Sequence, residues 1–365
     1  MKNTLFLIAL VLFLSFSAFG QRLGKPTKAS VPPTAAQQKI INEGVALHDA
    51  KKYEEAIAKY RSILAESPDC TAAMYEQSLS LQSKGDKLEA SEIAYQGTKY
   101  IADELPLFYS LIANNLDDLG KPDEAVQIYR DGLKALEGDN RFAKYRSNLQ
   151  FNLGITYARQ KKSTEARQAL KSAVENDFSY ASPHYVLSVV FKNSKYQMPA
   201  FLAASRLISL EFNTQRTRSS VDLIASTLEP AAKDPKTGNI TINLDFSAPK
   251  DEGEFAMYDM MLPTLTTIDD KKGEKKSPNR KFIDAIDSII AMLTEDKKLS
   301  STFVGKTYVP FMAELKKAGH VEAFGNMVLF IRSNDNAEAA KWIDANGPKL
   351  QDFLAWAKAY KLAGK

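Results

Sequence analysis

The sequence predicts a mostly α-helical protein: a solenoid of about five helix pairs, then a helical C-terminal domain with at most a small β element. Three observations predict this. Alanine recurs at near-constant intervals in the first half, apolar residues recur at helical spacing after residue 278, and only residues 240–246 alternate like a strand. With 365 residues, 44% of them hydrophobic and 25% charged, the composition excludes collagen-like and wholly disordered chains.

One alanine recurs in the same setting, with a helical stretch before it and a bulky residue or another alanine four positions later. By subtraction, its intervals are 34, 35, 41 and 34 residues. Small residues at such positions let two helices approach closely, while neighbouring large side chains fill the remaining space. The long interval predicts an extended connection over residues 136–142. The recurring residues are Ala56, Ala90, Ala125, Ala166 and Ala200.

This pattern resembles the tetratricopeptide repeat, a helix-turn-helix unit of about 34 residues. The resemblance covers residues 37–212. The first copy carries Gly44 and Tyr60 at its packing positions, and the third and fourth copies are similarly close. The second copy departs from the pattern at Ser78 and Ala94, and the fifth departs at Ser188 and Ala204. The resemblance implies a right-handed superhelix with a concave face.

The same resemblance implies which side chains line the concave groove, because the first helix of each pair faces it. At the implied groove positions, no Lys is followed four residues later by Asn, as it is in repeats that capture chaperone C-terminal carboxylates, so capture of that kind is not expected. Either a partner protein or the chain's own C-terminal half could cover the groove. The implied partner-binding residues are Ile41, Val45, His48, Tyr75, Leu79, Asn114, Asp117, Phe151, Ile155, Tyr185, Val189 and Lys192.

The remaining patterns divide the chain into five segments. The expected order is a signal peptide (1–20), a linker (21–35), the repeat solenoid with a capping helix (36–232), an irregular linker with a short strand (233–277) and a C-terminal helical domain (278–365).

The region after the solenoid contains one strand candidate and several amphipathic helices. Residues 240–246 need a strand partner, which can lie in a local hairpin, in the following segment 254–262, or in another molecule; a small local hairpin is the favoured choice. Ser277 and Pro278 suit the N-cap and first position of a helix. Further helices are expected over residues 308–317, 321–331, 337–345 and 348–362, with Trp342, Phe353, Trp356 and Tyr360 anchoring their core.

Residues 1–20 read as an export signal, with Lys2, an apolar run over residues 5–16, and small residues at Ala18 and Gly20. The run is short for a membrane span, which needs about 20 residues, so an uncleaved anchor is the less favoured alternative. We therefore expect an exported protein, periplasmic or extracellular, without a stable membrane span after cleavage.

The sequence offers few residues suited to catalysis. The single cysteine, Cys70, cannot close an intramolecular disulfide, and the three histidines form no paired metal motif. His184 takes a packing position in the fifth copy. The net charge of +4 does not favour a nucleic-acid partner, and no cofactor motif is present.

These observations predict a non-enzymatic, exported scaffold for protein–protein interaction. Its groove is expected to bind an envelope protein or peptide, or the protein's own C-terminal region. The alternative is that the repeats carry an enzymatic or ligand-binding C-terminal domain.

Overall fold

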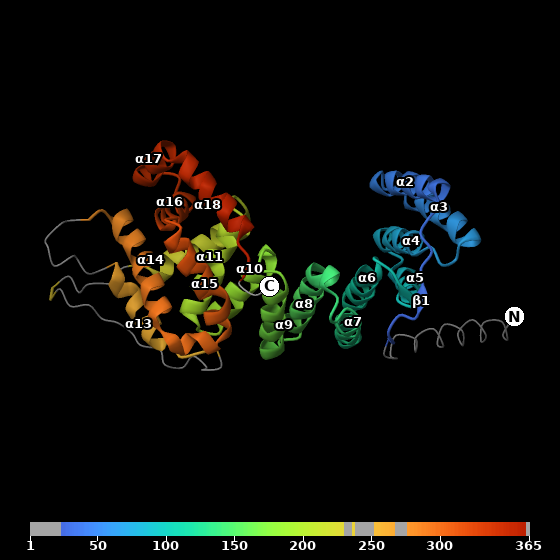
Figure 1. The fold of residues 1–365 in the computed structure, drawn as a ribbon, viewed down its shortest axis with the longest axis horizontal. Helices are drawn as coiled ribbons and strands as arrows, with labels where there is room; N and C mark the ends of the chain where they lie inside the picture. The colour runs from blue at the N-terminus through green and yellow to red at the C-terminus, as the bar shows by residue number, and fades with distance from the viewer. Residues whose placement is uncertain (1–22, 230–235, 238–251, 267–275, 363–365) are drawn as a thin grey trace. The chain divides into compact units, whose positions relative to one another are not determined.

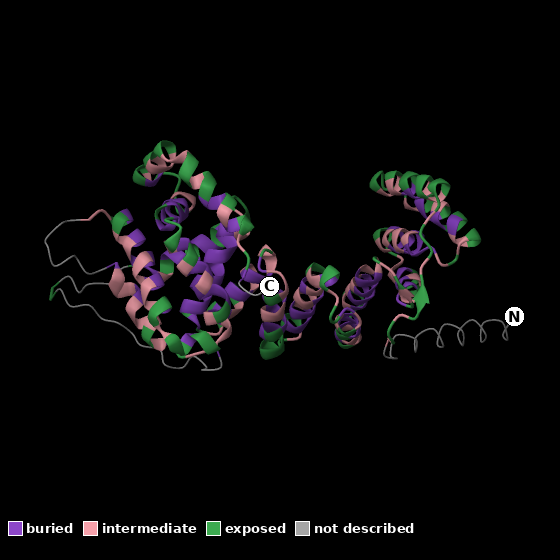
Figure 2. Ribbon diagram, viewed as in Figure 1, coloured by how far each residue is buried: buried purple, intermediate pink, exposed green. Residues whose placement is uncertain are grey.

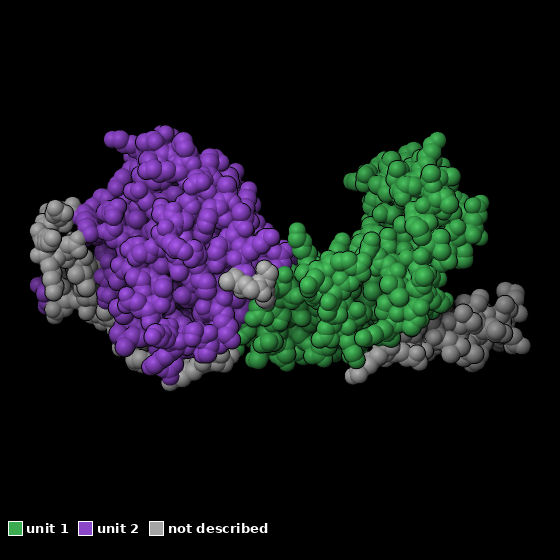
Figure 3. All heavy atoms as spheres, in the orientation of Figure 1, with its two compact units in different colours: residues 1–176 green, residues 177–365 purple. Residues whose placement is uncertain are grey.

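A computed structural model describes residues 23–229, 236–237, 252–266 and 276–362 (Figure 1). The chain divides into two compact units, unit 1 (residues 1–176) and unit 2 (residues 177–365), shown in Figure 3. The expected signal peptide and the strand candidate at 240–246 lie outside the described residues. The domain bounds expected from the sequence stay predictions, because they divide the chain by pattern, whereas the two units divide it by contact.

From residue 23 onward, unit 1 is built of four helix pairs, each packed on its neighbours in the chain (Figure 1). Each first helix also contacts the first helix of the next pair, as in α2 with α4, α4 with α6, and α6 with α8. The pairs are α2 (Ala35–Asp49) with α3 (Tyr53–Glu66), α4 (Thr71–Lys84) with α5 (Lys87–Gly97), α6 (Leu105–Asp118) with α7 (Pro122–Ala135), and α8 (Ala143–Arg159) with α9 (Ser163–Asn176).

The recurring alanine is the fourth residue of every second helix, including α11 (Gln197–Leu210) in unit 2, and it is at most 1% exposed. The two helices of a pair leave no free space where they cross. A Cβ added to Gly44 would lie 2.6 Å from the Tyr60 ring, and one added to Gly154 would lie 2.8 Å from Leu170 Cγ. The predicted repeat register is therefore confirmed by the packing.

The two irregular copies keep the same spacing between packing positions. A small first-helix residue and its second-helix counterpart are 16 positions apart in all copies, by subtraction, and Ser78, Ala94, Ser188 and Ala204 are all buried. Where the first position gains a hydroxymethyl group, the second position is alanine in place of tyrosine or leucine. A larger residue at the first position is therefore accompanied by a smaller one at the second, and both stay buried.

The long interval before Ala166 contains the expected extended connection. Its turn passes through Gly138, whose φ is +79°, into a short 3-10 helix, η2 (Asn140–Phe142). Arg146 fastens this turn by donating from Nη1 to the carbonyl oxygens of Leu136 and Asp139. The added residues also let α8 begin early, so that it has 17 residues where the preceding first helices α4 and α6 have 14 each.

The described part of the expected 21–35 linker is hydrogen-bonded to unit 1. Strand β1 (Lys28–Ala29) pairs in parallel with β2 (Tyr100–Ile101). Leu23 N donates to Asp131 Oδ2 at 2.9 Å, and Val31 N donates to Asp69 O at 3.3 Å. These contacts join residues about 40 to 110 positions apart, so no local sequence pattern indicates them.

Unit 2 contains the fifth helix pair and all later helices. Helix α11 lies at its centre, in contact with five other helices, and every residue from Met198 to Ser209 is buried (Figure 2). The others are α10 (Ala181–Asn193), α12 (Gln215–Thr227), α13 (Ala256–Leu265), α14 (Pro278–Glu295), η3 (Lys297–Ser301), α15 (Phe303–Lys317), α16 (Val321–Arg332), α17 (Ala337–Ala345) and α18 (Gly347–Ala359).

Most of the expected C-terminal helices are confirmed. Ser277 Oγ accepts from Arg280 N at 3.1 Å and caps α14, as the sequence predicts. Helix α15 begins at Phe303, five residues before the expected start, because Thr302 caps it by accepting from Gly305 N. The suggestion that residues 254–262 serve as a strand partner is wrong, since residues 256–262 form most of the apolar helix α13.

An arginine without a carboxylate partner among the described residues lies at the centre of unit 2. Arg206 is fully buried, donates from Nη1 to Ala357 O at 2.7 Å, and donates from Nε to Phe178 O at 3.2 Å. Its guanidinium lies 4.5 Å from the ring centre of Phe178 and 4.7 Å from that of Phe311. Burial lowers the pKa of Arg206 to about 9. These contacts connect α11 to α15 and α18.

His184 packs beside this arginine, as the sequence predicts for a core histidine. Its Nε2 lies 3.0 Å from Phe178 O, and its Nδ1 lies 2.9 Å from the Tyr308 hydroxyl. Because a carbonyl only accepts, the neutral ring carries its proton on Nε2 and accepts from Tyr308 at Nδ1. Burial, followed by the charge of Arg206, lowers the pKa of His184 to about 3.

Candidate binding groove

Three consecutive first helices of unit 1 line a cavity of about 420 Å³. Helix α4 contributes Tyr75, Leu79 and Gln82; α6 contributes Leu107, Ser110, Leu111 and Asn114; and α8 contributes Lys144, Tyr145 and Asn148. The cavity exists because the first helices contact one another from pair to pair, while their second helices lie behind them. We call these ten residues the groove site.

The walls of the groove site combine aromatic, aliphatic and amide side chains. Tyr75 is half-buried, with its ring 6.0 Å from that of Phe108 in an edge-to-face arrangement. Burial, with a smaller contribution from the charge of Glu76, raises the pKa of Tyr75 to about 12, so this phenol is neutral at physiological pH. Tyr145 is 38% exposed. Partly exposed tyrosines suit protein contacts, because one end of the ring is apolar and the other is polar.

Hydrogen bonds between repeats hold the polar residues in place. Asn114 Oδ1 accepts from Tyr129 Oη at 2.5 Å and from Asn152 Nδ2 at 3.2 Å. Gln82 Nε2 donates to Asn115 Oδ1 at 2.7 Å, which joins α4 to α6. The bond from Tyr129 lies within the third pair, and the other two connect one pair to the next, so the stacking itself pre-organises the groove site.

Asp117 is also engaged between repeats. Its Oδ2 accepts from Thr156 Oγ1 at 2.9 Å and from Arg159 Nη1 at 2.7 Å. Only 10% of the Asp117 side chain is exposed, so it serves as a connection between α6 and α8 more than as an open contact point.

The structure brings together three of the twelve residues expected in the groove, Tyr75, Leu79 and Asn114. Ile41 belongs to the core between α2 and α3, at 5% exposure, with Val45 packed against that core. His48 Nδ1 lies 2.8 Å from Ser80 Oγ, which joins α2 to α4. Phe151 and Ile155 are half-buried on α8. Tyr185, Val189 and Lys192 lie on α10 in unit 2, where Val189 is 37% exposed and Lys192 is also exposed.

Sequence reasoning missed Leu107 and Leu111 on α6, and it missed three residues of α8: Lys144, Tyr145 and Asn148. It placed the fourth copy's groove positions by the spacing of the earlier copies, but α8 begins about one turn early and presents these residues beside α6. The interval of 41 residues was the signal that could have found them.

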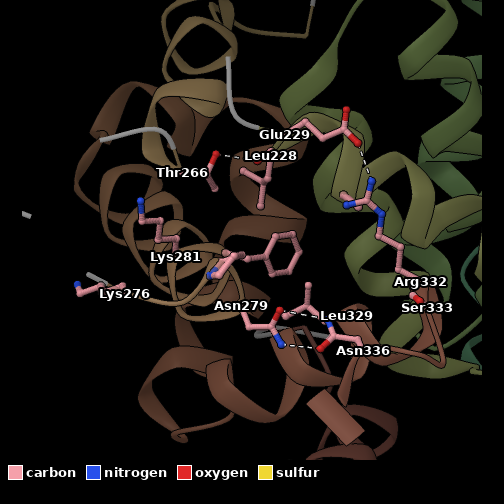
Figure 4. Close-up of a pocket in the computed structure, with 13 residues that line it drawn as sticks. Leu228, Glu229, Thr266, Lys276, Asn279, Lys281, Leu329, Arg332, Ser333 and Asn336 are labelled. Atoms are coloured by element: carbon pink, nitrogen blue, oxygen red, sulfur yellow. Dashed lines mark hydrogen bonds and ion pairs between the residues drawn. The ribbon is translucent and has the colours of Figure 1, made fainter. Parts of the chain in front are cut away.

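Unit 2 has a second and larger cavity, of about 730 Å³, between the ends of α12, α14 and α16 (Figure 4). None of the expected groove residues lines it. His320 lies elsewhere in unit 2, with its ring centre 5.1 Å from that of Trp356. Among the described residues, no cluster of His, Cys, Asp or Glu side chains is placed to hold a metal ion. Within the same residues, every helix is too short or too polar to span a bilayer.

Stacked helix pairs with a small residue at each crossing define a helical-repeat protein. Residues 111–181 match the family described as "Tetratricopeptide repeat". With the register confirmed at all five crossings, the chain is a tetratricopeptide-repeat protein. This fold suggests a role in protein–protein interaction.

Three solved structures illustrate what the chain is similar to. PilF from Pseudomonas aeruginosa has 16% identity and a TM-score of 0.44, over 52% of this chain and 83% of that one. The C-terminal part of a TPR repeat-containing protein from Cytophaga hutchinsonii has 12% identity and a TM-score of 0.41, over 82% and 98%. YrrB, described as a TPR protein with an unusual peptide-binding site, has 17% identity and a TM-score of 0.37, over 50% and 90%. A search of curated proteins gave no match.

Proposed function

We propose that the protein is an exported, non-enzymatic scaffold whose groove site binds an extended segment of an envelope protein. The observation that carries this proposal is the cavity between α4, α6 and α8, where two partly exposed tyrosines lie among leucine and amide side chains. Aromatic and aliphatic side chains provide apolar contact area, and an amide can both donate to and accept from a peptide backbone.

The non-enzymatic part of the proposal is supported by how the histidines are engaged. His48 contacts Ser80, His184 contacts Tyr308, and His320 packs against the rings of Phe353 and Trp356. These contacts fit packing and inter-helix connection. The export part is supported by residues 1–20, whose charge and apolar pattern suit a cleaved signal.

Affinity capture from the cell envelope tests the groove. We expect Tyr75→Ala combined with Leu79→Ala to lower retention of the partner at least about tenfold, because central apolar anchors carry most of an interface's binding energy. Asn148→Arg should act similarly by placing bulk and charge in the cavity while leaving the core intact. Leu88→Ala is the matched control, since Leu88 is 45% exposed on the second helix α5.

Circular dichroism should show unchanged helix content in all these variants. Partner retention that survives both the double substitution and Asn148→Arg would contradict the groove assignment. Cell fractionation with mass measurement tests export separately: we expect an envelope or external protein that lacks residues 1–20, and a cytoplasmic full-length chain would contradict it.

A further inference from the structure

Helix α13 holds one side against the rest of unit 2. Asp259 Oδ1 accepts from Met198 N of α11 at 2.8 Å. Tyr258 Oη donates to Asp296 Oδ2, beyond the end of α14, at 2.6 Å. Leu262 is buried one turn further along the same side. At about 3.6 residues per turn these positions form one stripe, so the contacts fix the rotation of α13 about its own axis.

The opposite side of α13 carries three methionines. Met257 is 65% exposed, and Met260 and Met261 are half-buried. The outward side of a surface helix ordinarily carries polar and charged side chains. Asp259 is the one charged residue of α13, and it lies on the inward side. Packing within unit 2 therefore does not account for the outward methionines.

The spacing of the three methionines brings their sulfur atoms within reach of one point. Residues three and four positions apart are neighbours on a helix, with their Cβ atoms about 5–6 Å apart. Met257 has Met260 three positions away and Met261 four positions away. Because the methionine side chain is unbranched and flexible, three Sδ atoms can turn toward a single ion above the helix. The inward hydrogen bonds already hold the backbone, so binding orders side chains alone.

The donor set selects the metal. A thioether is a neutral, soft ligand, which suits Cu(I), whereas Mg²⁺, Ca²⁺ and Mn²⁺ take oxygen ligands. Structural Zn²⁺ is held by thiolate, imidazole or carboxylate groups, and the described residues contain no cluster of these placed to bind a metal.

We propose that Met257, Met260 and Met261 bind one Cu(I) ion through their Sδ atoms. The ion lies on the outer side of α13, in unit 2. This site is independent of the groove function proposed for unit 1.

Methyl NMR of the full-length protein tests the proposal, with ¹³C-labelled methionine methyl groups and Ag(I) as a redox-stable substitute for Cu(I). We expect the signals of Met257, Met260 and Met261 to shift together and to saturate at one ion per chain. The signals of Met74 and Met327, which are 5% and 3% exposed in other helices, should not shift. Zn²⁺ should shift none of them, because thioethers bind it poorly.

Competition with bicinchoninate, in ascorbate and without oxygen, measures the affinity for Cu(I). Replacing all three methionines by leucine keeps the apolar volume but removes the sulfur atoms. We expect this triple variant, Met257→Leu with Met260→Leu and Met261→Leu, to bind Cu(I) at least about tenfold more weakly. Met74→Leu is the matched control and should leave the affinity unchanged.

Several outcomes would overturn the proposal. Ag(I) could leave the three signals in place, or shift that of Met257 alone, which would indicate an adventitious ion only. Wild-type affinity in the triple variant would assign Cu(I) to another ligand, such as the buried thiol of Cys70. Signals that change with protein concentration but not with Ag(I) would indicate a contact between copies of the chain in place of a metal site.

Discussion

Units 1 and 2 both contain tetratricopeptide helix pairs but bury them differently. In unit 1, each helix packs on its chain neighbours, and the first helices pack on one another. Helix α9 accordingly has six buried residues on one face and polar residues on the other. In unit 2, α11 is the same element of its pair but is apolar or small nearly all round, and α10, α12, α13, α15 and α18 cover it.

The comparison separates two kinds of information in a repeat sequence. The small residues at the crossing specify a helix pair in either unit. What covers the outside of the pair depends on the remaining residues of the second helix, since a helix that is apolar on all sides must be buried on all sides. The fifth copy is therefore a repeat by its register and a core element by its composition.

Removal of the buried arginine should have the largest effect. We expect Arg206→Ala to destabilise unit 2 by about 3–5 kcal/mol, because it leaves Ala357 O unpaired, leaves Phe178 O with only its bond from His184, and opens a large cavity between the aromatic rings. Both tryptophans, Trp342 and Trp356, are in unit 2, so urea unfolding followed by tryptophan fluorescence reports this unit. Arg218→Ala, at an exposed position on α12, is the control. A change below about 1 kcal/mol would show that unit 2 does not depend on this centre.

The second prediction concerns how the stability of unit 2 depends on pH. Two of its buried groups change this stability in opposite directions. His184 has a folded pKa of about 3, below its ordinary 6.5, so acidification through this range removes stability. Asp259, whose Oδ1 accepts from Met198 N at 2.8 Å, has its pKa raised by burial to about 6, above its ordinary 3.8, so acidification adds stability. Each slope is about 1.4 kcal/mol per pH unit, so between about pH 4 and 6 the two nearly cancel.

Single variants should reveal each slope. We expect Asp259→Asn to make unit 2 lose stability steeply as the pH falls from 6 to 4, and His184→Gln to reverse the sign. The measurement is the urea midpoint, followed by tryptophan fluorescence at several pH values. The test is how the midpoint changes with pH in each protein, and the absolute stability does not enter it. Parallel pH profiles for the wild type and both variants would contradict the assignment.

The smallest effect is expected at the crossing alanines, where equivalent positions of the two units can be compared. Ala166→Leu in unit 1 and Ala200→Leu in unit 2 should each cost about 1–3 kcal/mol by overpacking. We expect Ala200→Leu to shift the fluorescence transition and Ala166→Leu to shift only the transition seen by circular dichroism. Ala46→Leu, exposed on α2, is the control. A neutral Ala166→Leu would mean that the repeat register is wrong.

The elements set by local patterns could be predicted from the sequence. The five crossing alanines, the Ser277 cap and the bounds of α17 depend on residues close in the chain, and the structure confirms them. Three groove residues also follow from the repeat spacing. The early start of α8 adds Lys144, Tyr145 and Asn148 to the groove site, and only the interval of 41 residues indicated it.

Features that join distant residues left little local signal. The bond between Arg206 and Ala357 spans 151 positions, and that between Leu23 and Asp131 spans 108. The unit 2 cavity is assembled from four separate stretches of chain. Only the scarcity of polar residues in α11 could have indicated that the fifth pair lies inside a core.

The central position of α11 has a consequence for how the repeat array can lengthen or shorten. A helix pair duplicated or lost between α2 and α9 leaves its neighbours facing surfaces of the same kind. Loss of α10 and α11 would remove the helix on which α12, α13, α15 and α18 all pack. Repeat number can therefore vary in unit 1, whereas the fifth copy must be retained for unit 2 to fold.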